Sequence, residues 1–453
     1  MYLTDYEEEM LAGKHGAAQA MALKVLVAVG ECFGAKRLLE VGRVHVASSN
    51  QEADVWFAEK LLKMGGRCLV SPTVNPGFNL AYLARHLSIS KEDADLMERA
   101  RRAYKELGAI MTLSCTPYLE ANVPRFGEIL SYSETSVTVY VNSVIGARTN
   151  REAVQSSLCA AITGRVPEYG FLLDENRKGT VLVQVEADIK SDFGYQLLGS
   201  CTQKIGTGVP VFVGLPQNPS QEGLINLGTQ LNTTGSYAMF HIPGVTPEAP
   251  TLNDAFGGKQ AERVVTITNE DLENMHKQVS QPPGKIDFAM FGCPHFTIVQ
   301  VQEVARLVQG KKLNAEMWVL TSSLNKELAC RTGMLEAIEE AGGHIVEDTC
   351  IDQPCWSHLH GKVGVTDSPK CAYYAKMRGM NFIIRDLKYR RGKPQEKCSF
   401  PRMIFCSTWL IRKVAESWKK GIPWRVNVLQ GKSWFFLQER GAPLFRWTGS
   451  TSS

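Results

Sequence analysis

Short apolar runs alternate with longer amphipathic segments through most of the chain, and this alternation constrains the fold more than any other feature. Apolar runs of about four to eight residues bounded by turn residues predict strands, whereas apolar residues at every third or fourth position predict helices. Strands that alternate with helices pair in parallel, because each helix returns the chain to the same end of the sheet. The sequence therefore predicts an α/β fold of several lobes, with largely parallel sheets flanked by helices.

The expected elements follow from these patterns. We expect strands at 36–46, 67–71, 109–113, 181–186, 209–213, 288–291, 316–320 and 346–348. We expect helices at 1–30, 52–64, 92–107, 297–308 and 324–341. Thr4 and Glu7 match a capping box at the start of the first helix. Residues 72–77 should form a loop, because two prolines and a glycine interrupt regular structure, and residues 215–252 should form a long irregular segment.

The composition excludes several classes of protein. Of the 453 residues, 44% are hydrophobic and 21% charged, which is typical of a globular chain and excludes disorder, collagen and coiled coil. No apolar run is long enough to predict a membrane span. The acidic N-terminus lacks a signal or transit pattern, so we expect a cytoplasmic protein whose twelve cysteines are mostly reduced. No CxxC pair occurs, which excludes a zinc ribbon or a thioredoxin-like motif.

The last part of the chain differs in charge from the rest. Residues 388–453 hold 14 Lys and Arg against 3 Asp and Glu, although the whole chain has a net charge of only +4. This tail also holds five of the eight tryptophans, so it could bind single-stranded nucleic acid by stacking and phosphate contacts. We favour the alternative that the tail is not part of the evolved fold, because it lacks clean periodicity after residue 415. We predict three regions: 1–280, 281–387 after the Pro-Pro-Gly linker, and the tail.

Three cysteines follow expected strands, where ligands bind in open α/β sheets. Cys115 follows 109–113, Cys293 follows 288–291, and Cys350 follows 346–348. If they converge, three thiolates can hold an iron–sulfur cluster and leave one iron open to substrate. Structural cysteines at tight turns, or a three-cysteine zinc site, remain alternatives. Cys355 gives a second possible pairing with Cys350, at a C-x4-C spacing.

Polar residues are dense in 131–151, and we interpret this segment as an anion-binding substrate loop, since guanidinium groups suit carboxylates and phosphates. The alternative is the capped start of a helix, which itself attracts anions. A second set of polar residues follows the expected strand 67–71, and its signal for function is weaker. The polar loop 164–177 is as consistent with a surface turn as with a site. We expect His295 and His344 to be structural. The candidates in the first two groups are Ser133, Glu134, Asn142, Ser143, Arg148, Asn150 and Arg151, and Ser71, Thr73 and Asn75.

Long multi-residue motifs make residues 1–385 resemble the catalytic, large-subunit part of aconitase X. The motifs are LSCTPYLEANVPRFGE, SETSVTVYVNSVIGARTNRE, AAITGRVPEYG with LDENR, FGCPH and GGHIVEDTC. The resemblance implies an aconitase-like build, with α/β lobes around an iron–sulfur cluster of the [2Fe-2S] or [4Fe-4S] type. It implies cluster ligands at Cys115, Cys293 and Cys350.

The resemblance also implies an activity. Members of the family are dehydratases that act on cis-3-hydroxy-L-proline or on mevalonate 5-phosphate, and we expect the first substrate. A base would remove a proton while iron coordinates the leaving hydroxyl. The implied substrate-binding residues include Ser71, Thr73, Asn75, Asn142, Arg148 and Arg151. The family's Gly/Ser-rich swivelling domain, thought to supply a catalytic serine, is not recognisable here, so either a separate small subunit joins, which we expect, or the chain is inactive alone. The alternative function is a non-catalytic relative whose basic tail binds nucleic acid or a partner. We expect no membrane partner and no nucleic acid.

Overall fold

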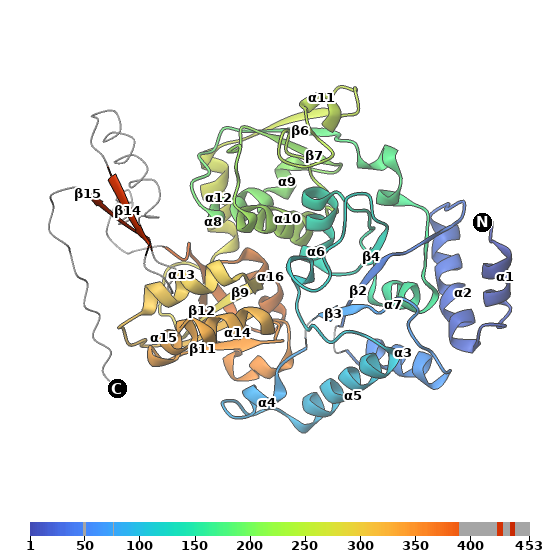
Figure 1. Cartoon of the computed structure of the whole chain (residues 1–453), viewed down its shortest axis with the longest axis horizontal. Coiled ribbons are helices and arrows are strands. Elements are labelled where there is room, and N and C mark those ends of the chain that lie inside the picture. Colours follow the sequence, from blue (N-terminus) through green and yellow to red (C-terminus); the bar gives the residue numbers. More distant parts are fainter. Residues whose placement is uncertain (49–50, 76, 389–423, 429–434, 440–453) are drawn as a thin grey trace. The chain divides into compact units, whose positions relative to one another are not determined.

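The computed structural model describes residues 1–48, 51–75, 77–388, 424–428 and 435–439. The chain divides into two compact units, Met1–Tyr389 and Arg390–Ser453 (Figure 1). In the second unit, β14 (Trp424–Val428) and β15 (Phe435–Glu439) pair antiparallel. The rest of the basic tail lies outside the described residues, so the possible binding of nucleic acid by this tail stays a prediction. Among the described residues, no helix is both long and apolar enough to cross a membrane.

The first part of the main unit contains a parallel three-stranded sheet with the order β3-β2-β4, and an antiparallel pair, β1 with β5. Its strands are β1 (Leu38–Glu40), β2 (Arg43–Ala47), β3 (Thr73–Asn75), β4 (Leu130–Tyr132) and β5 (Arg165–Pro167). Its helices are α1 (Asp5–Leu11), α2 (Ala17–Cys32), α3 (Glu52–Lys63), α4 (Leu80–Leu83), α5 (Lys91–Leu107), the turn η1 (Pro117–Leu119), α6 (Thr135–Tyr140), the π-helical turn η2 (Val141–Ile145) and α7 (Val154–Thr163).

The structure corrects several expected elements in this part. The single helix expected at 1–30 is two helices, because Gly13 and Gly16 take positive φ between α1 and α2, although the capping box at Thr4 is confirmed. The strand expected at 36–46 divides into β1 and β2, which join different sheets. Instead of a strand at 67–71 and a loop at 72–77, the buried strand β3 begins directly after Pro72, whose missing N–H lies outside the strand and costs no ladder bond.

The segment 109–113, expected as a strand, makes only one isolated bridge, between Ile110 and Thr73. Leu113 has a φ of 46°, which ends the extended conformation two residues before Cys115. The residues VTVYV in 131–151 look strand-like in sequence but lie in α6 and η2. In both cases tertiary packing overrode a β-rich composition.

The middle part has the parallel sheet β7-β6-β8. Its elements are η3 (Gly170–Leu172), η4 (Asp174–Arg177), β6 (Val181–Val185), α8 (Asp192–Ser200), α9 (Thr202–Ile205), β7 (Pro210–Val213), α10 (Gln221–Gly235), α11 (Leu252–Ala255), β8 (Arg263–Ile267) and α12 (Asn269–Val279). The irregular segment expected at 215–252 was wrong, because it contains α10. Ten consecutive residues of α10, 223–232, are buried, so no amphipathic stripe marks it in the sequence.

The last part has five parallel strands in the order β11-β10-β9-β12-β13. Its elements are β9 (Phe288–Phe296), α13 (Ile298–Val308), β10 (Glu316–Thr321), α14 (Ser323–Arg331), α15 (Met334–Glu340), β11 (Gly343–Glu347), η5 (Pro354–Leu359), β12 (Val363–Thr366), α16 (Pro369–Met377) and β13 (Asn381–Ile384). The helix expected at 324–341 is interrupted by Gly333, at a φ of 74°. The expectation of an α/β fold with largely parallel sheets is confirmed.

Both faces of this five-stranded sheet are buried. Met317 and Val319 of β10 pack into one cluster with residues of α13, α14 and α15, while Trp318 and Leu320 pack into another. That second cluster includes Phe78, Leu83 and Met97 from the first part of the chain. The segment after β3 therefore packs on the last sheet (Figure 1). This contact joins the first part of the chain, which holds Cys115, to the last part, which holds Cys293 and Cys350.

Candidate functional site

The five-stranded sheet has a topological switch point between β9 and β12. From β9 the chain moves outward through β10 and β11, and then returns to the other side of β9 as β12 and β13. Such a reversal leaves a crevice at the carboxyl ends of the two strands, where ligands bind in open α/β sheets. Cys293 lies near the end of β9, and Asp367 and Ser368 follow β12 directly.

A bulge in β9 moves Cys293 out of the regular ladder. Phe291 pairs with Val319 and Phe296 pairs with Thr321, so the four residues between them oppose a single residue of β10. Gly292 begins this bulge with a φ of 96°, and a Cβ there would lie 2.0 Å from the Leu320 carbonyl oxygen. Only glycine fits this position. Cys293 therefore does not follow a strand end, as the sequence suggested, but lies within β9 at an irregularity.

Cys350 follows β11 by three residues and is held from two directions. Its backbone N–H donates to the Gly77 carbonyl at 3.2 Å, and its own carbonyl accepts from Nε1 of Trp356 at 2.8 Å. The Asp352 N–H lies 3.4 Å from the Cys350 sulfur, while the Asp352 carboxylate pairs with Arg378. Cys350 is thus fixed between the loop after β3 and the last sheet.

His295 connects the three cysteine segments. Its backbone N–H donates to Sγ of Cys115 at 3.2 Å, and its Nε2 lies 2.9 Å from the Thr349 carbonyl oxygen, next to Cys350. His295 is itself two residues after Cys293. The imidazole is 3% exposed and burial lowers its pKa to about 4, so the ring is neutral near pH 7. His295 is structural, as expected, and the segments that it holds together are those of the candidate site.

Cys115 and Cys293 are buried, Cys350 is half-buried, and the three thiols influence one another electrostatically. Burial raises the pKa of Cys115 and of Cys350 to about 12, and burial also raises the pKa of Cys293 well above the usual range of a thiol. A negative charge on Cys350 would raise the pKa of Cys115 and of Cys293 further, in each case after the larger effect of burial. Across the described part of the chain, no three His, Cys, Asp or Glu side chains converge closely enough to hold a single metal ion.

A buried ion pair lies beside the cysteines. Lys370 Nζ lies 2.9 Å from Glu134 Oε1, and Nδ2 of Asn75 donates to Glu134 Oε2 at 2.9 Å. Burial opposes both charges, yet the two partners raise the pKa of Lys370 and lower that of Glu134, so both groups are charged. Burial lowers the pKa of His45, on β2, to about 4, although Glu134 opposes that shift. Asn75 and Glu134 lie at the carboxyl edge of the small sheet β3-β2-β4.

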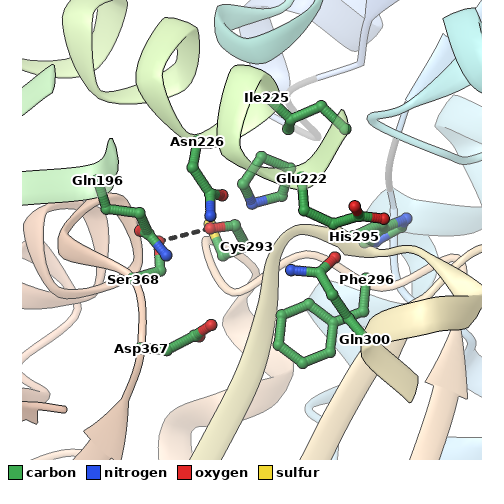
Figure 2. A pocket seen from close by; sticks show the side chains of 11 residues that line it. Gln196, Glu222, Ile225, Asn226, Cys293, His295, Phe296, Gln300, Asp367 and Ser368 are labelled. Atoms are coloured by element: carbon green, nitrogen blue, oxygen red, sulfur yellow. Dashed lines mark hydrogen bonds between the residues drawn. The ribbon is translucent and has the colours of Figure 1, made fainter. Parts of the chain in front are cut away.

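A narrow pocket opens at the switch point beside Cys293. Asp367 lines it and directs a carboxylate into it, and Ser368 donates to the Cys293 carbonyl at 2.5 Å (Figure 2). Asp367 is 7% exposed, its Oδ1 has no partner among the described residues, and burial raises its pKa to about 7. The pocket is narrow, and the room in it is close to the need of one water. Its lining also includes Gln196, Glu222, Ile225, Asn226, Pro294, His295, Phe296 and Gln300.

Most of the predicted substrate loop holds the fold together. Asn142 donates to the carbonyls of Thr149 and Ala238 and accepts from the Thr149 N–H and Arg177. Ser143 accepts from the Phe240 N–H. Within the same loop, Ser133 bonds the backbone of β2, and Asn150 bonds that of Tyr169 and Phe171. Of the residues predicted in 131–151, the structure brings Glu134 beside the cysteines.

The remaining predicted residues are divided. Thr73 is buried, and its hydroxyl contacts Nδ1 of His45 at 2.8 Å, so it supports the Asn75 side of the site. Ser71 is exposed. Arg148 is paired with Asp174 and donates to a backbone carbonyl, and Arg151 is exposed. Substrate binding by these arginines stays a prediction.

Sequence reasoning missed Lys370 and Asp367. Asp367 lies in the turn between β12 and α16, and Lys370 is the second residue of α16. This strand–helix junction was not among the expected elements. A strand VGVT followed by Asp-Ser-Pro, an N-cap signal, could have identified it.

Family models and known proteins match this chain along most of its length. Residues 1–175 match the model of the aconitase X first domain, residues 179–277 the second domain, and residues 286–389 the third domain. A solved structure titled as the holo-form of Thermococcus kodakaraensis aconitase X superposes with a TM-score of 0.78 at 34% identity, covering 85% of this chain and 98% of the other.

Two groups of curated relatives carry different names. The phosphomevalonate dehydratase large subunit of Thermococcus kodakarensis is 35% identical over 399 residues, which are 86% of this chain and 98% of the relative. The cis-3-hydroxy-L-proline dehydratase of Pseudomonas aeruginosa is 33% identical over 388 residues, covering 82% of this chain and 66% of the relative. The identities to the two groups are similar, so similarity alone does not resolve a substrate.

Proposed function

We propose, from the premise that this chain belongs to the aconitase X family, that Cys115, Cys293 and Cys350 hold an iron–sulfur cluster at which a small hydroxy acid is dehydrated. The chain is a hydro-lyase, as its relatives named dehydratases are. The observation that carries the proposal is His295, which joins the segments of all three cysteines through hydrogen bonds on both sides.

The donor set fits a cluster better than a single metal ion. Zn²⁺ needs its sulfur ligands at about 2.3 Å from one centre, and no such convergence occurs among the described His, Cys, Asp and Glu side chains. A cluster spreads its cysteine ligands over several iron atoms, so buried thiols that affect one another without sharing one centre match it. Three thiols, rather than four, leave one iron without a protein ligand.

When bound, such a cluster supplies a Lewis-acidic iron for the leaving hydroxyl. Around it, Asn75 and Glu134 orient polar groups of the substrate, and Lys370 holds Glu134 in its charged form. Asp367 can hold or release a proton at its unpartnered Oδ1 near neutral pH, since burial raises its pKa to about 7. The hydrophobic contacts of Trp356 and Phe78 exclude water from the Cys350 side.

We propose cis-3-hydroxy-L-proline as the substrate, because the ion pair beside the cysteines has one positive and one negative member. A zwitterion matches such a pair, whereas a phosphate dianion needs an excess of cations. The predicted arginines do not supply that excess, since Arg148 is paired with Asp174 and Arg151 is exposed. Mevalonate 5-phosphate is the second candidate, favoured by relatives of that name that this chain covers almost completely.

We further propose a small-subunit partner, because several relatives are named large subunits. Their names imply a second chain, and the narrow pocket beside Cys293 has no room for a hydroxy acid in the present arrangement. A partner that covers the switch point would complete a larger cavity.

The test is anaerobic reconstitution of the full chain with iron and sulfide, followed by iron and sulfide analysis and an assay of both substrates with a matching small subunit. We expect bound iron and sulfide, visible absorption, and faster dehydration of cis-3-hydroxy-L-proline. Cys115→Ala, Cys293→Ala and Cys350→Ala together should abolish cluster binding. Cys159→Ala, at a buried cysteine of α7 in the core of the first part, is the matched control and should retain it. A triple variant with full iron and sulfide would contradict the proposal.

A further inference from the structure

Lys370 lies where a lysine is electrostatically unfavourable. It is the second residue of α16, a nine-residue helix whose N-cap is Ser368, and the N-terminus of a helix carries a partial positive charge. The residue is also only 5% exposed, and a buried ammonium loses its hydration. A lysine persists in such a place when negative charge around it outweighs both costs.

Its visible partners account for one negative charge. Glu134 accepts from Nζ at 2.9 Å, and the ring of Tyr374, on the same helix, lies 5.9 Å from Nζ. Glu134 is shared, because its second oxygen accepts from Asn75. One shared carboxylate opposes one ammonium and a helix N-terminus, which leaves positive potential directed at whatever lies next to α16.

The three cysteines lie next to it. Glu134, the partner of Lys370, lies two residues before Ser136, which donates to the Cys115 carbonyl at 3.1 Å, so the segment of Cys115 lies beside the ion pair of Lys370. Ser368, two residues earlier, donates to the Cys293 carbonyl, which fixes the start of α16 against the bulge of β9.

We propose that Lys370 is a positioning residue whose ammonium offsets the negative charge of the three thiolates and their cluster, and thereby sets the cluster's reduction potential, with Glu134 acting in the opposite direction. The inference rests on the proposed function, because it requires a cluster at these cysteines. A positive charge nearby favours the reduced, more negative cluster, and a negative charge disfavours it. Removing the charge of Lys370 should therefore lower the reduction potential of the cluster, and removing the charge of Glu134 should raise it.

The experiment uses the full chain, reconstituted anaerobically with iron and sulfide, and a redox titration followed by visible absorption. Lys370→Met should lower the midpoint potential and Glu134→Gln should raise it. Each shift should reach at least a tenfold change in the reduction equilibrium, about 59 mV for one electron. Lys376→Met, at an exposed lysine of the same helix, is the matched control and should leave the potential unchanged.

Because removing one buried charge can unfold a protein, the double variant Lys370→Met with Glu134→Gln provides a second measurement. It contains no uncompensated charge, and its potential should lie between those of the single variants. Iron and sulfide analysis separates the two proposals. Wild-type protein that binds no cluster contradicts the proposed function. Variants that bind the cluster, with potentials that coincide or shift in the same direction, overturn the role of Lys370 alone.

Discussion

Arg177 with Glu248 and Lys370 with Glu134 are both deeply buried ion pairs, and their surroundings differ. Arg177 is 1% exposed and uses its guanidinium fully, bonding both oxygens of Glu248, two atoms of Asn142, and the carbonyls of Phe171 and Ala147. Lys370 has Glu134 as its carboxylate partner and lies against the cysteines.

The difference separates a structural network from a functional one. Around Arg177 the guanidinium and the Asn142 side chain are fully bonded, although Nδ1 of His241, whose Nε2 contacts the Arg177 carbonyl, has no partner among the described residues. The network fixes the loop 142–149 and the turn η4 in one conformation. Around Lys370, Nδ1 of His295 and Oδ1 of Asp367, three residues before the lysine, have no partner among the described residues. Buried polar groups without partners are costly, and they collect where a ligand completes them.

The largest test of the comparison is Arg177→Met. The variant leaves Glu248 and several carbonyls buried without their donor, and breaking a buried pair in this way costs about 3–5 kcal/mol. Denaturant unfolding should show that loss. Arg148→Met, which removes a partly exposed arginine paired with Asp174, should cost about 0–1 kcal/mol. A loss below about 1 kcal/mol for Arg177→Met would break the assignment of this network to stability.

Asp367→Asn tests the other region of the comparison, the surroundings of Lys370. Burial raises the pKa of Asp367 to about 7 in the folded chain, with smaller contributions from Asp386 and Asp192. Its contribution to stability is therefore complete below the unfolded pKa, near 3.8, and is lost as pH rises through about 7. The asparagine cannot ionise, so the variant should be more stable than wild type at pH 8, by about 2–4 kcal/mol, and similar to it at pH 4.

Thermal or denaturant unfolding across pH 4–8 measures this difference. Asp348, whose pKa burial also raises to about 7, should leave the variant with a residual pH dependence of the same sign. A variant that is less stable than wild type at pH 8 would mean that Asp367 has a partner in the folded chain.

The smallest effect comes from a matched pair of asparagines. Asn142→Ala removes a side chain whose donors and acceptor are all used, and the unpaired groups left behind should cost about 1–3 kcal/mol. Asn75→Ala removes a single hydrogen bond, to Glu134, so its loss of stability should be smaller, about 1 kcal/mol. Activity should respond in the reverse order, with kcat/KM falling more for Asn75→Ala. If Asn142→Ala and Asn75→Ala lost the same amount of stability and the same amount of activity, the distinction between a structural and a functional asparagine would be contradicted.

The sequence predicted the strand–helix alternation well where the pattern was regular. The helices at 52–64, 92–107 and 297–308 and the strands at 181–186, 209–213 and 316–320 were confirmed to within a residue or two. It failed where burial removes the pattern. The helix α10 is buried along most of its length and mixes buried apolar residues with buried polar ones such as Asn226 and Gln230, and β3 has three residues between prolines, so neither carries a period that can be recognised.

The candidate site was predicted in part for a similar reason. Glu134 and Asn75 were identified because polar residues at strand ends commonly face a ligand. The same argument selected Asn142 and Ser143, whose partners, Ala238 and Phe240, lie almost a hundred residues away in sequence. Nothing local distinguishes an asparagine that bonds a distant backbone from one that faces a substrate.

By itself, the sequence determined the α/β class, the cysteines at turns and the motifs that identify the family, because these depend on neighbouring residues. The tertiary structure decided which polar side chains are consumed by the fold and which remain open, and it alone placed Lys370 beside residues 134, 115 and 293. Such pairings depend on how the loop after β3 and the bulge of β9 pack against α16. Long-range packing sets where a charge lies, and no local pattern encodes it.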